Sequence, residues 1–298
     1  MINGILNVYK EAGYTSHDVV AKLRGICRQK KIGHTGTLDP DAVGVLPVCL
    51  GNATRLCDML TDKSKEYEAV LLLGKVTDTQ DISGKVLEEH PVLMEEEQAV
   101  EAVLSFLGSY EQIPPMYSAL KVNGKKLYEL ARAGKEVERA GRPVEIHRID
   151  ILSVALPEIT FRVACSKGTY IRTLCHDIGR KLGCGGTMKS LKRTRVGTFA
   201  IDDALPLGEL EKLAAEGRLE GYVIPADAMF PELPCLTIRD SFRRLLENGN
   251  SFYSNQVREE LEAVDGIRVK VYDTEGRFYG IYAFSDEKGR YQPVKMFL

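Results

Sequence analysis

The sequence predicts an α+β protein with a small, mostly β domain at its C-terminal end. Two observations favour this fold class. Segments patterned as strands and segments patterned as amphipathic helices both occur between residue 4 and residue 200. Beyond the closely spaced Pro225, Pro231 and Pro234, one helix-like and three strand-like segments follow. The 298 residues suit about two domains, and the 44% of hydrophobic residues can form a sizeable core.

Two strands and two helices are expected before residue 80, with a loop rich in glycine and proline among them. The first helix has an apolar stripe that begins at Val19, and Thr15 or Ser16 can cap its N-terminus. The expected strands are Gly4–Lys10 and Lys65–Leu73, and the expected helices are Ser16–Arg28 and Thr54–Leu60.

The rest of the chain continues the mixture of helices and strands. Before the prolines we expect an acidic helix Met94–Leu107, a loop Glu111–Lys126 that leads into a turn, a strand Ile159–Cys165, a helix from about Thr169 to Leu182, and a strand pair around Thr187–Phe199. After the prolines we expect a helix Ser241–Glu247 and strands Arg268–Asp273, Arg277–Phe284 and Tyr291–Phe297.

Several classes of protein are disfavoured by composition. No apolar run approaches the roughly 20 residues that span a bilayer. The N-terminal segment lacks the basic, apolar and small-residue regions of a secretion signal. The seven cysteines form no C-x-x-C pair, which indicates reduced thiols rather than a disulfide framework or a zinc site. These features predict a cytoplasmic protein.

The net charge of −2 hides two basic segments. Arg162–Arg195 contains nine Lys or Arg and one acid, and Lys121–Arg148 contains eight basic and four acidic residues. In contrast, Glu88–Glu111 contains seven acids and no Lys or Arg. The basic segments are either solvated helix faces or parts of one surface that binds a polyanion.

The loop KIGHTGTLDPDAVGVLPVCLG, Lys31–Gly51, surrounds Asp39 with residues that restrict the backbone. Asp-Pro is a common start of a turn, and Asp39 with Asp41 and His34 could also be read as metal ligands. No other compact group of acids or histidines completes a metal shell, however. The density of glycine and proline favours a loop that aims the Asp39 side chain.

Two further stretches contain candidate functional residues. CSKGTYIRTLCHDIG, Cys165–Gly179, reads as strand, turn and helix, with Tyr170 and Arg172 in the first helical turn. An arginine at that position can pair bidentately with a carboxylate or a phosphate, or it can form a surface ion pair. In KSKEYEAV, Tyr67 lies within a strand pattern, where packing is the ordinary role of a tyrosine.

Together these stretches resemble the TruB family of bacterial tRNA pseudouridine synthases, which act on uridine 55 in the T arm of tRNA. GHTGTLDPDAVGVLPVCLGNATR is similar to the aspartate motif of the family, KEYEAVLLLG to its tyrosine motif and CSKGTYIRTLCHDIG to its arginine motif. TDTQDISG, IPPMYSALKVNGKKLYELAR and GGTMKSLKRTRVGTF match further family segments in the same order. The C-terminal residues resemble a PUA-like RNA-binding domain more weakly.

The resemblance implies roles for the candidate residues. Asp39 would be the nucleophile, Arg172 would hold its carboxylate ionised and oriented, and Tyr67 would stack on the uracil and assist loss of the C5 proton. The carboxylate could attack C1′, add to C6 of the ring, or support a glycal intermediate. The substrate-binding residues implied in addition to Tyr67 are Tyr170 and Leu191 in the uracil pocket, His34 against the RNA, and Lys10 near the pocket.

The resemblance also implies a mixed, mainly antiparallel central sheet flanked by helices, the pseudouridine synthase fold. Residues 1–230 would form the catalytic domain, with an RNA-binding insertion at about 112–148, and residues 235–298 would form the PUA-like domain. The enzyme would flip the uridine out of its stack and isomerise it as a monomer, with no cofactor, metal, membrane or obligate protein partner. One departure is Glu11 after Lys10, where the family usually has proline. The alternative functions are a non-catalytic tRNA-binding or folding module and a metal-dependent phosphohydrolase.

Overall fold

The computed structural model describes residues 1–122 and 124–298. A ten-stranded sheet runs through most of the chain in the order β14-β1-β3-β12-β4-β11-β10-β7, with β2 paired to β3 and β13 paired to β12. Its strands are β1 (Gly4–Lys10), β2 (Ile32–His34), β3 (Val43–Leu50), β4 (Lys65–Leu73), β7 (Gly108–Gln112), β10 (Arg142–Ala155), β11 (Glu158–Cys165), β12 (Gly186–Val196), β13 (Phe199–Ala200) and β14 (Leu205–Pro206).

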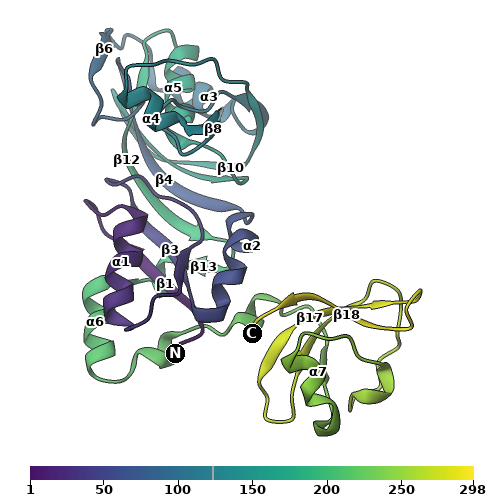
Figure 1. Cartoon of the computed structure of the whole chain (residues 1–298). Coiled ribbons are helices and arrows are strands. Elements are labelled where there is room, and N and C mark those ends of the chain that lie inside the picture. Colours follow the sequence, from purple (N-terminus) through teal and green to yellow (C-terminus); the bar gives the residue numbers. More distant parts are fainter. Residues whose placement is uncertain (123) are drawn as a thin grey trace.

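The sheet is mixed and mainly antiparallel, as expected. Only β1 with β14 and β3 with β12 pair in parallel among the described strands of this sheet. The parallel contact between β3 and β12 joins two halves of the molecule, and the long strands β4 and β12 run from one half into the other (Figure 1).

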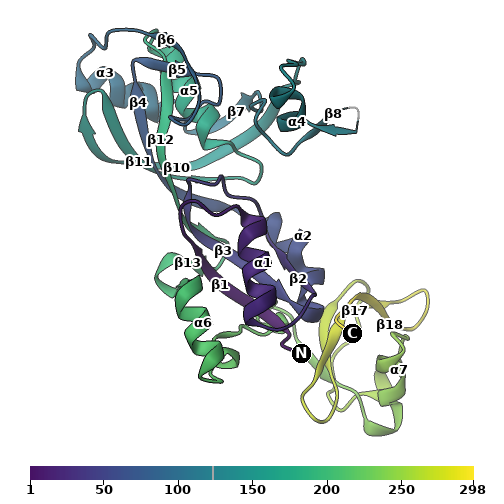
Figure 2. The same ribbon diagram turned by 60° about the vertical axis from the view of Figure 1, so that its left-hand side comes forward.

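Each half has its own helices and apolar core. In one half, α1 (Ser16–Ile26) and α6 (Leu207–Ala215) pack on β1 and β3. Thr15 caps α1 through its side chain and forms a capping box with Asp18. In the other half, α3 (Glu96–Leu104) and α5 (Ile171–Lys181) pack against β4, β11 and β12 (Figure 2).

Shorter elements lie between these strands and helices along the chain. They are α2 (Cys57–Thr61), α4 (Leu127–Arg132), the hairpin β5 (Lys75–Thr77) with β6 (Val86–Glu89), the hairpin β8 (Lys121–Val122) with β9 (Lys125–Lys126), and the 3-10 helices η1 (Gly51–Leu56), η2 (Ile201–Asp203), η3 (Leu219–Tyr222) and η4 (Ala226–Met229). The segment expected as a loop before a turn therefore contains a small hairpin. Of the expected Asn123-Gly124 turn, Asn123 lies outside the described residues.

The C-terminal residues form a four-stranded sheet in the order β15-β16-β17-β18 with its own apolar core. Its elements are β15 (Cys235–Thr237), β16 (Arg268–Tyr272), β17 (Phe278–Ser285), β18 (Arg290–Met296), α7 (Arg243–Glu247), η5 (Asp240–Phe242) and η6 (Ser254–Gln256). The expected small, mostly β fold of this part is confirmed. Ile281 and Phe297 pack into the core around η1, and Arg55 donates to the carbonyl of Met296 at 2.6 Å.

The structure differs from the expected elements in several places. The stretch Lys31–Gly51, expected as a loop, contains β2 and the buried eight-residue strand β3, because its second half is an apolar run. The short strands β5, β6, β7, β14 and β15 were not expected either. The 14-residue strand β10 and the helix α6 were not expected. The expected strand pair at 187–199 is one long strand, β12, with a two-residue partner, β13. Tyr170 is the N-cap of α5 rather than part of its first turn. No helix in the described residues is long and apolar enough to cross a membrane.

Candidate active site

The loop that presents Asp39 connects β2 to β3 and is held by several neighbouring segments. The Leu38 amide donates to Ser16 Oγ of α1 at 3.0 Å, and the Thr35 amide donates to the Pro47 carbonyl at 3.2 Å. The Ala42 amide closes a turn on the Asp39 carbonyl at 3.1 Å. The glycines and prolines around Asp39 thus belong to a loop whose backbone is held by hydrogen bonds on both sides of Asp39.

Lys10 anchors the same loop from β1. Its Nζ donates to the carbonyl of Pro40 at 2.8 Å and to the carbonyl of Glu11 at 3.0 Å. Burial lowers the pKa of Lys10 to about 8, against the charges of Asp41 and Asp39 that raise it. The backbone at Glu11, where the family usually has proline, is therefore tied to the Asp39 loop through the Lys10 side chain.

Arg172 binds both carboxylate oxygens of Asp39 through two nitrogens of its guanidinium. Nε lies 3.0 Å from Oδ2 and Nη2 lies 3.1 Å from Oδ1 of Asp39. The guanidinium also donates to the carbonyl oxygens of Thr79 at 3.1 Å and Tyr117 at 2.9 Å. The Arg172 side chain is 7% exposed and that of Asp39 is 35% exposed, so the carboxylate is oriented from the protein side and remains reachable.

Opposing effects act on the charge of Asp39. Burial raises its pKa, and the nearby carboxylate of Asp81 adds to this increase. The charges of Arg172 and Lys10 lower the pKa of Asp39 and oppose the effect of burial. Asp81 lies on the far side of Arg172, with Oδ2 at 3.8 Å from Nη1, so the guanidinium is shared between two carboxylates.

Tyr67 and Leu191 lie on the adjacent strands β4 and β12. Tyr67 pairs with Arg193 and Leu191 pairs with Ala69 in the strand register, which puts all four on one face of the sheet. Tyr67 and Leu191 are each 8% exposed and belong to the same apolar cluster as Leu38, next to Asp39. Burial raises the pKa of Tyr67 to about 12, while the charge of Arg193 opposes that rise.

Tyr170 caps α5, two residues before Arg172. Its amide donates to Gln112 Oε1 at 2.7 Å, and Gln112 Nε2 donates to its carbonyl at 3.0 Å. The buried Gln112, at the end of β7, thereby joins the insertion to the start of α5. Burial raises the pKa of Tyr170.

His34 lies at the end of β2 and makes none of the described contacts to Asp39 or Arg172. Its Nδ1 accepts the Gly36 amide at 3.3 Å, and its ring packs edge-on against His17 with centroids 5.3 Å apart. Burial lowers the pKa of His34, which favours the neutral ring at pH 7. Within residues 1–122 and 124–298, no group of three or more His, Cys, Asp or Glu could hold a metal ion.

The structure thus brings together Asp39, Arg172, Tyr67, Leu191 and Lys10, with Tyr170 at the helix start and His34 further out. Sequence reasoning missed three residues of this site, Asp81, Gln112 and Arg193. A signal existed for Arg193, because period-two alternation puts it on the same strand face as Leu191. Asp81 lies in TDTQDISG, a segment that matched the family but to which no role was assigned, and Gln112 is far from Tyr170 along the chain, with no local pattern that marks it.

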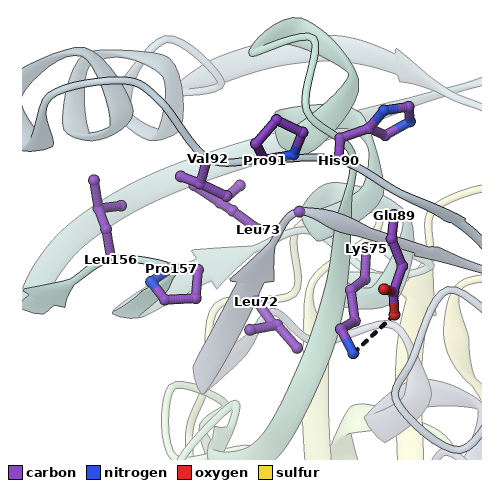
Figure 3. A pocket seen from close by; sticks show the side chains of 10 residues that line it. Leu72, Leu73, Lys75, Glu89, His90, Pro91, Val92, Leu156 and Pro157 are labelled. Carbon is purple, nitrogen blue, oxygen red and sulfur yellow. Dashed lines mark ion pairs between the residues drawn. The ribbon is translucent and has the colours of Figure 1, made fainter.

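A separate cavity of about 580 Å³ lies at the other end of β4 (Figure 3). Leu72, Leu73, Leu156 and Pro157 form much of its wall, and a Lys75–Glu89 ion pair of 3.1 Å borders it. None of the predicted site residues lines this cavity. The candidate active site is defined by its side chains on the middle of the sheet and not by this hollow.

The two basic segments differ in how their charges are used. Six of the nine basic residues in 162–195 form ion pairs, and Glu66 and Glu68 of β4 bind three of them. In 121–148 only Arg139 and Arg148 have an acidic partner among the described residues. The free charges of this segment are therefore concentrated between Lys121 and Arg142.

The fold is that of the pseudouridine synthases. A chain in the crystal structure of a Cbf5–Nop10–Gar1 complex matches 99% of this chain and 85% of its own length, with a TM-score of 0.71 and 27% identity. A chain of the archaeal box H/ACA sRNP Nop10–Cbf5 complex matches 99% of this chain and 86% of its own length, with a TM-score of 0.69 and 26% identity. These likenesses extend over 99% of this chain.

The sequence comparisons identify the family. Residues 24–171 match the model of the TruB family pseudouridylate synthase N-terminal domain, and residues 172–231 match the tRNA pseudouridylate synthase B C-terminal domain. A tRNA pseudouridine synthase B of Lachnoclostridium phytofermentans is 53% identical over all of both chains. One of Alkaliphilus oremlandii is 46% identical over 97% of this chain and 96% of its own. The chain belongs to the TruB family of pseudouridylate synthases, as its motifs indicated.

Proposed function

We propose that this protein converts uridine 55 in the T arm of tRNA to pseudouridine. The observation that carries the proposal is the bidentate Asp39–Arg172 pair, placed beside the buried Tyr67 and Leu191 on the central sheet. The curated relatives bear the name tRNA pseudouridine synthase B, which supports tRNA as the substrate. The protein is then an intramolecular transferase of the isomerase class.

The reaction needs one well-oriented carboxylate. The bond between N1 of uracil and C1′ breaks, the base turns, and a bond between C5 and C1′ forms. The C5 proton leaves, N1 gains a proton, and nothing is oxidised or reduced. Asp39 acts as the nucleophile, and attack at C1′, addition to C6 and support of a glycal each use its carboxylate. Arg172 keeps that carboxylate ionised against the effect of burial.

The other site residues act on the base. Tyr67 stacks on the uracil and assists removal of the C5 proton, while Leu191 and Tyr170 close the sides of the base pocket. His34 contacts the RNA where the nucleotide leaves its stack. Lys10 supports the Asp39 loop next to the pocket through Pro40. The apolar neighbours shield the protein side of the Asp39 carboxylate from water, which strengthens its interaction with Arg172.

The RNA contacts are assigned to the free basic residues. Unstacking a nucleotide costs a few kcal/mol, and contacts to phosphates offset it. Because most charges of 162–195 are paired, we place the phosphate contacts mainly in the insertion at 112–148, with its exposed Lys121, Lys125 and Arg132. We propose residues 1–230 as the catalytic domain and 235–298 as the PUA-like RNA-binding domain. The second family match ends at residue 231, which supports this boundary.

We further propose that the chain acts in the cytoplasm as a monomer, without an obligate protein partner. The structurally similar Cbf5 chains are from complexes with other proteins. The free basic residues of the insertion and the C-terminal sheet provide this chain with RNA-contacting surface of its own.

The test is to map pseudouridine in unmodified tRNA after incubation with purified protein and no added metal. Position 55 should convert, and tRNA with a T-loop cytidine at that position should not. Asp39→Asn should abolish tritium release from C5-labelled uridine while tRNA still binds. Asp41→Asn, which changes an exposed carboxylate two residues away, is the matched control and should retain turnover. Tritium release that survives in Asp39→Asn contradicts the assignment of the nucleophile.

The same experiments distinguish the alternatives. A non-catalytic tRNA-binding module predicts binding without conversion in the native protein. A phosphohydrolase that uses Asp39, Asp41 and His34 predicts loss of activity in excess EDTA. The geometry disfavours that reading, because both Asp39 oxygens contact Arg172 and His34 Nδ1 accepts a backbone amide. Activity that disappears with EDTA and returns with a divalent cation would overturn the cofactor-free proposal.

A further inference from the structure

Arg193 is a fully buried guanidinium at the candidate active site. It lies on β12, two residues after Leu191, and is 2% exposed. Its Nε donates to the Val45 carbonyl at 2.7 Å, and its Nη1 and Nη2 lie 3.4 Å from the carbonyl oxygens of Thr37 and Gly36. Among the described residues no carboxylate forms an ion pair with it, and a buried charge without such a partner is costly.

The contacts of Arg193 connect the two sides of the site. Gly36 and Thr37 lie three and two residues before Asp39, on the loop that presents the carboxylate. Across the sheet, Arg193 pairs in register with Tyr67 on β4, so the two side chains lie next to each other on one face, and the charge of Arg193 lowers the pKa of the phenol. Arg193 therefore lies between the Asp39 loop and Tyr67. None of the other loop contacts described above joins the loop to Tyr67.

The shape of arginine suits this arrangement. A guanidinium is planar and rigid, and its donors point in fixed directions, so it can bind carbonyl groups on β3 and on the loop at once. A lysine at the same position would keep the charge but would offer a single ammonium on a flexible stem. The carbonyl oxygens of Gly36, Thr37 and Val45 would then compete for the single ammonium group of the lysine.

We propose that Arg193 is a positioning residue that sets the placement of the Asp39 loop relative to Tyr67. The inference rests on the proposed function and assigns a role to a residue outside the Asp39–Arg172–Tyr67 set. Arg172 orients the carboxylate itself, whereas Arg193 acts through the backbone two and three residues upstream and through the phenol. Without the Arg193 guanidinium, the side chains of Asp39, Arg172 and Tyr67 are all still present but are displaced from one another.

The test compares Arg193→Lys with Arg195→Met. Arg195 lies on the same strand, but its side chain is 48% exposed and pairs with Glu66, away from the site. Single-turnover formation of pseudouridine with enzyme in excess reports on the chemical step, and filter binding reports on tRNA affinity. A displacement of about 1 Å costs about 100-fold in rate, so Arg193→Lys should slow turnover by about that factor. Its tRNA affinity and its melting curve should remain close to native.

A double-mutant cycle adds a measurement that a general loss of stability would not affect. Tyr67→Phe removes the hydroxyl whose pKa the charge of Arg193 lowers. If Arg193 acts partly through that hydroxyl, the rate losses of Arg193→Lys and Tyr67→Phe should be less than multiplicative. Arg195→Met combined with Tyr67→Phe should be multiplicative, because the two sites do not share a contact.

The outcomes are distinct. A native single-turnover rate in Arg193→Lys overturns the inference, and so does a rate loss explained wholly by weaker tRNA binding. An unfolded Arg193→Lys would make Arg193 a stability residue and would also overturn it. Failure of the proposed function is recognised separately, because the native protein would then form no pseudouridine in the same assay.

Discussion

Arg172 binds both carboxylate oxygens of Asp39, through Nε at 3.0 Å and Nη2 at 3.1 Å, although the two residues are 133 positions apart in the chain. The pair joins the loop between β2 and β3 to the first turn of α5. Because Thr79 and Tyr117 supply carbonyl oxygens to the same guanidinium, its orientation is fixed from the protein side. The carboxylate is thereby prepared before any RNA arrives.

Replacing Arg172 by lysine should therefore affect turnover much more than binding. Lysine keeps the positive charge but cannot bind two oxygens and two carbonyls with one planar group. We expect a loss of about 100-fold or more in the single-turnover rate, in the range that mispositioned catalytic groups produce. Arg162→Lys changes an arginine on the outer face that pairs with Glu68 and should remain near native. Equal rates for the two variants would contradict the role given to Arg172.

The pH dependence should show the charge balance at Asp39. The proposed nucleophile Asp39 must be ionised to act, and burial raises its pKa, so the rate should fall as pH decreases through that raised pKa. The Lys10 charge lowers the pKa of Asp39, and Lys10→Met should therefore move the acidic limb of the profile to higher pH. The pKa of Lys10 is itself lowered to about 8, so Lys10 is charged throughout the acidic range and can exert this effect on Asp39 there. An acidic limb that stays in place or moves down would contradict the assignment.

Gln112 should couple the insertion to the helix that carries Arg172. Its amide group satisfies both the amide and the carbonyl of Tyr170, and an unsatisfied buried group costs about 1–3 kcal/mol. Gln112→Ala should lower the free energy of unfolding by about that amount and should slow turnover, because the start of α5 loses its anchor. Gln98→Ala, at the exposed cap of α3, is the control and should leave turnover unchanged. Urea unfolding and single-turnover assays measure the two effects.

Salt dependence should separate the two basic segments. Lys121 and Lys125 are exposed in the β8–β9 hairpin, whereas Lys189 and Lys192 pair with Glu158 and Glu68. Each phosphate contact contributes a slope of about −0.7 to −0.9 to the plot of log affinity against log salt. The Lys121→Ala, Lys125→Ala double variant should lose about 1.5 from the slope for tRNA. The Lys189→Ala, Lys192→Ala double variant should retain the native slope, and the reverse result would relocate the RNA contacts.

The local elements could be predicted from sequence where one pattern dominates. Gly4–Lys10 and Lys65–Leu73 have the expected bounds, because each is a compact run of strand-forming residues. β10 was missed because its side chains are largely exposed and its pairing contains irregularities, so it lacks a regular alternation. The residues of the candidate site were identified through the resemblance of the motifs to a family. No physical rule predicts from one sequence that Asp39 lies against Arg172.

Contacts to backbone groups account for most of what could not be predicted. Arg193 and Gln112, which were missed, and Lys10, which was expected but without its contacts, bind carbonyl or amide groups. Every residue has such groups, so these contacts leave no pattern in the sequence. Which basic residues are paired with acids could likewise not be predicted from the sequence. The basic segment 162–195 has a high charge density, yet three of its basic residues pair with Glu66 and Glu68 on β4, between 94 and 129 positions earlier in the chain.

Gly44 should be intolerant of a side chain, because β3 and β12 meet there. Its φ is +107°, and a Cβ atom at this position would lie 2.2 Å from the carbonyl oxygen of Arg193. Gly44→Ala must therefore push the two strands apart, in addition to straining the backbone, and should lower the free energy of unfolding by about 3–5 kcal/mol. Gly183→Ala has a φ of +74° with no atom within 4 Å of the new Cβ, so it should cost only the backbone strain, about 1–2 kcal/mol. Urea unfolding gives both values, and equal losses would show that the strands can separate without cost.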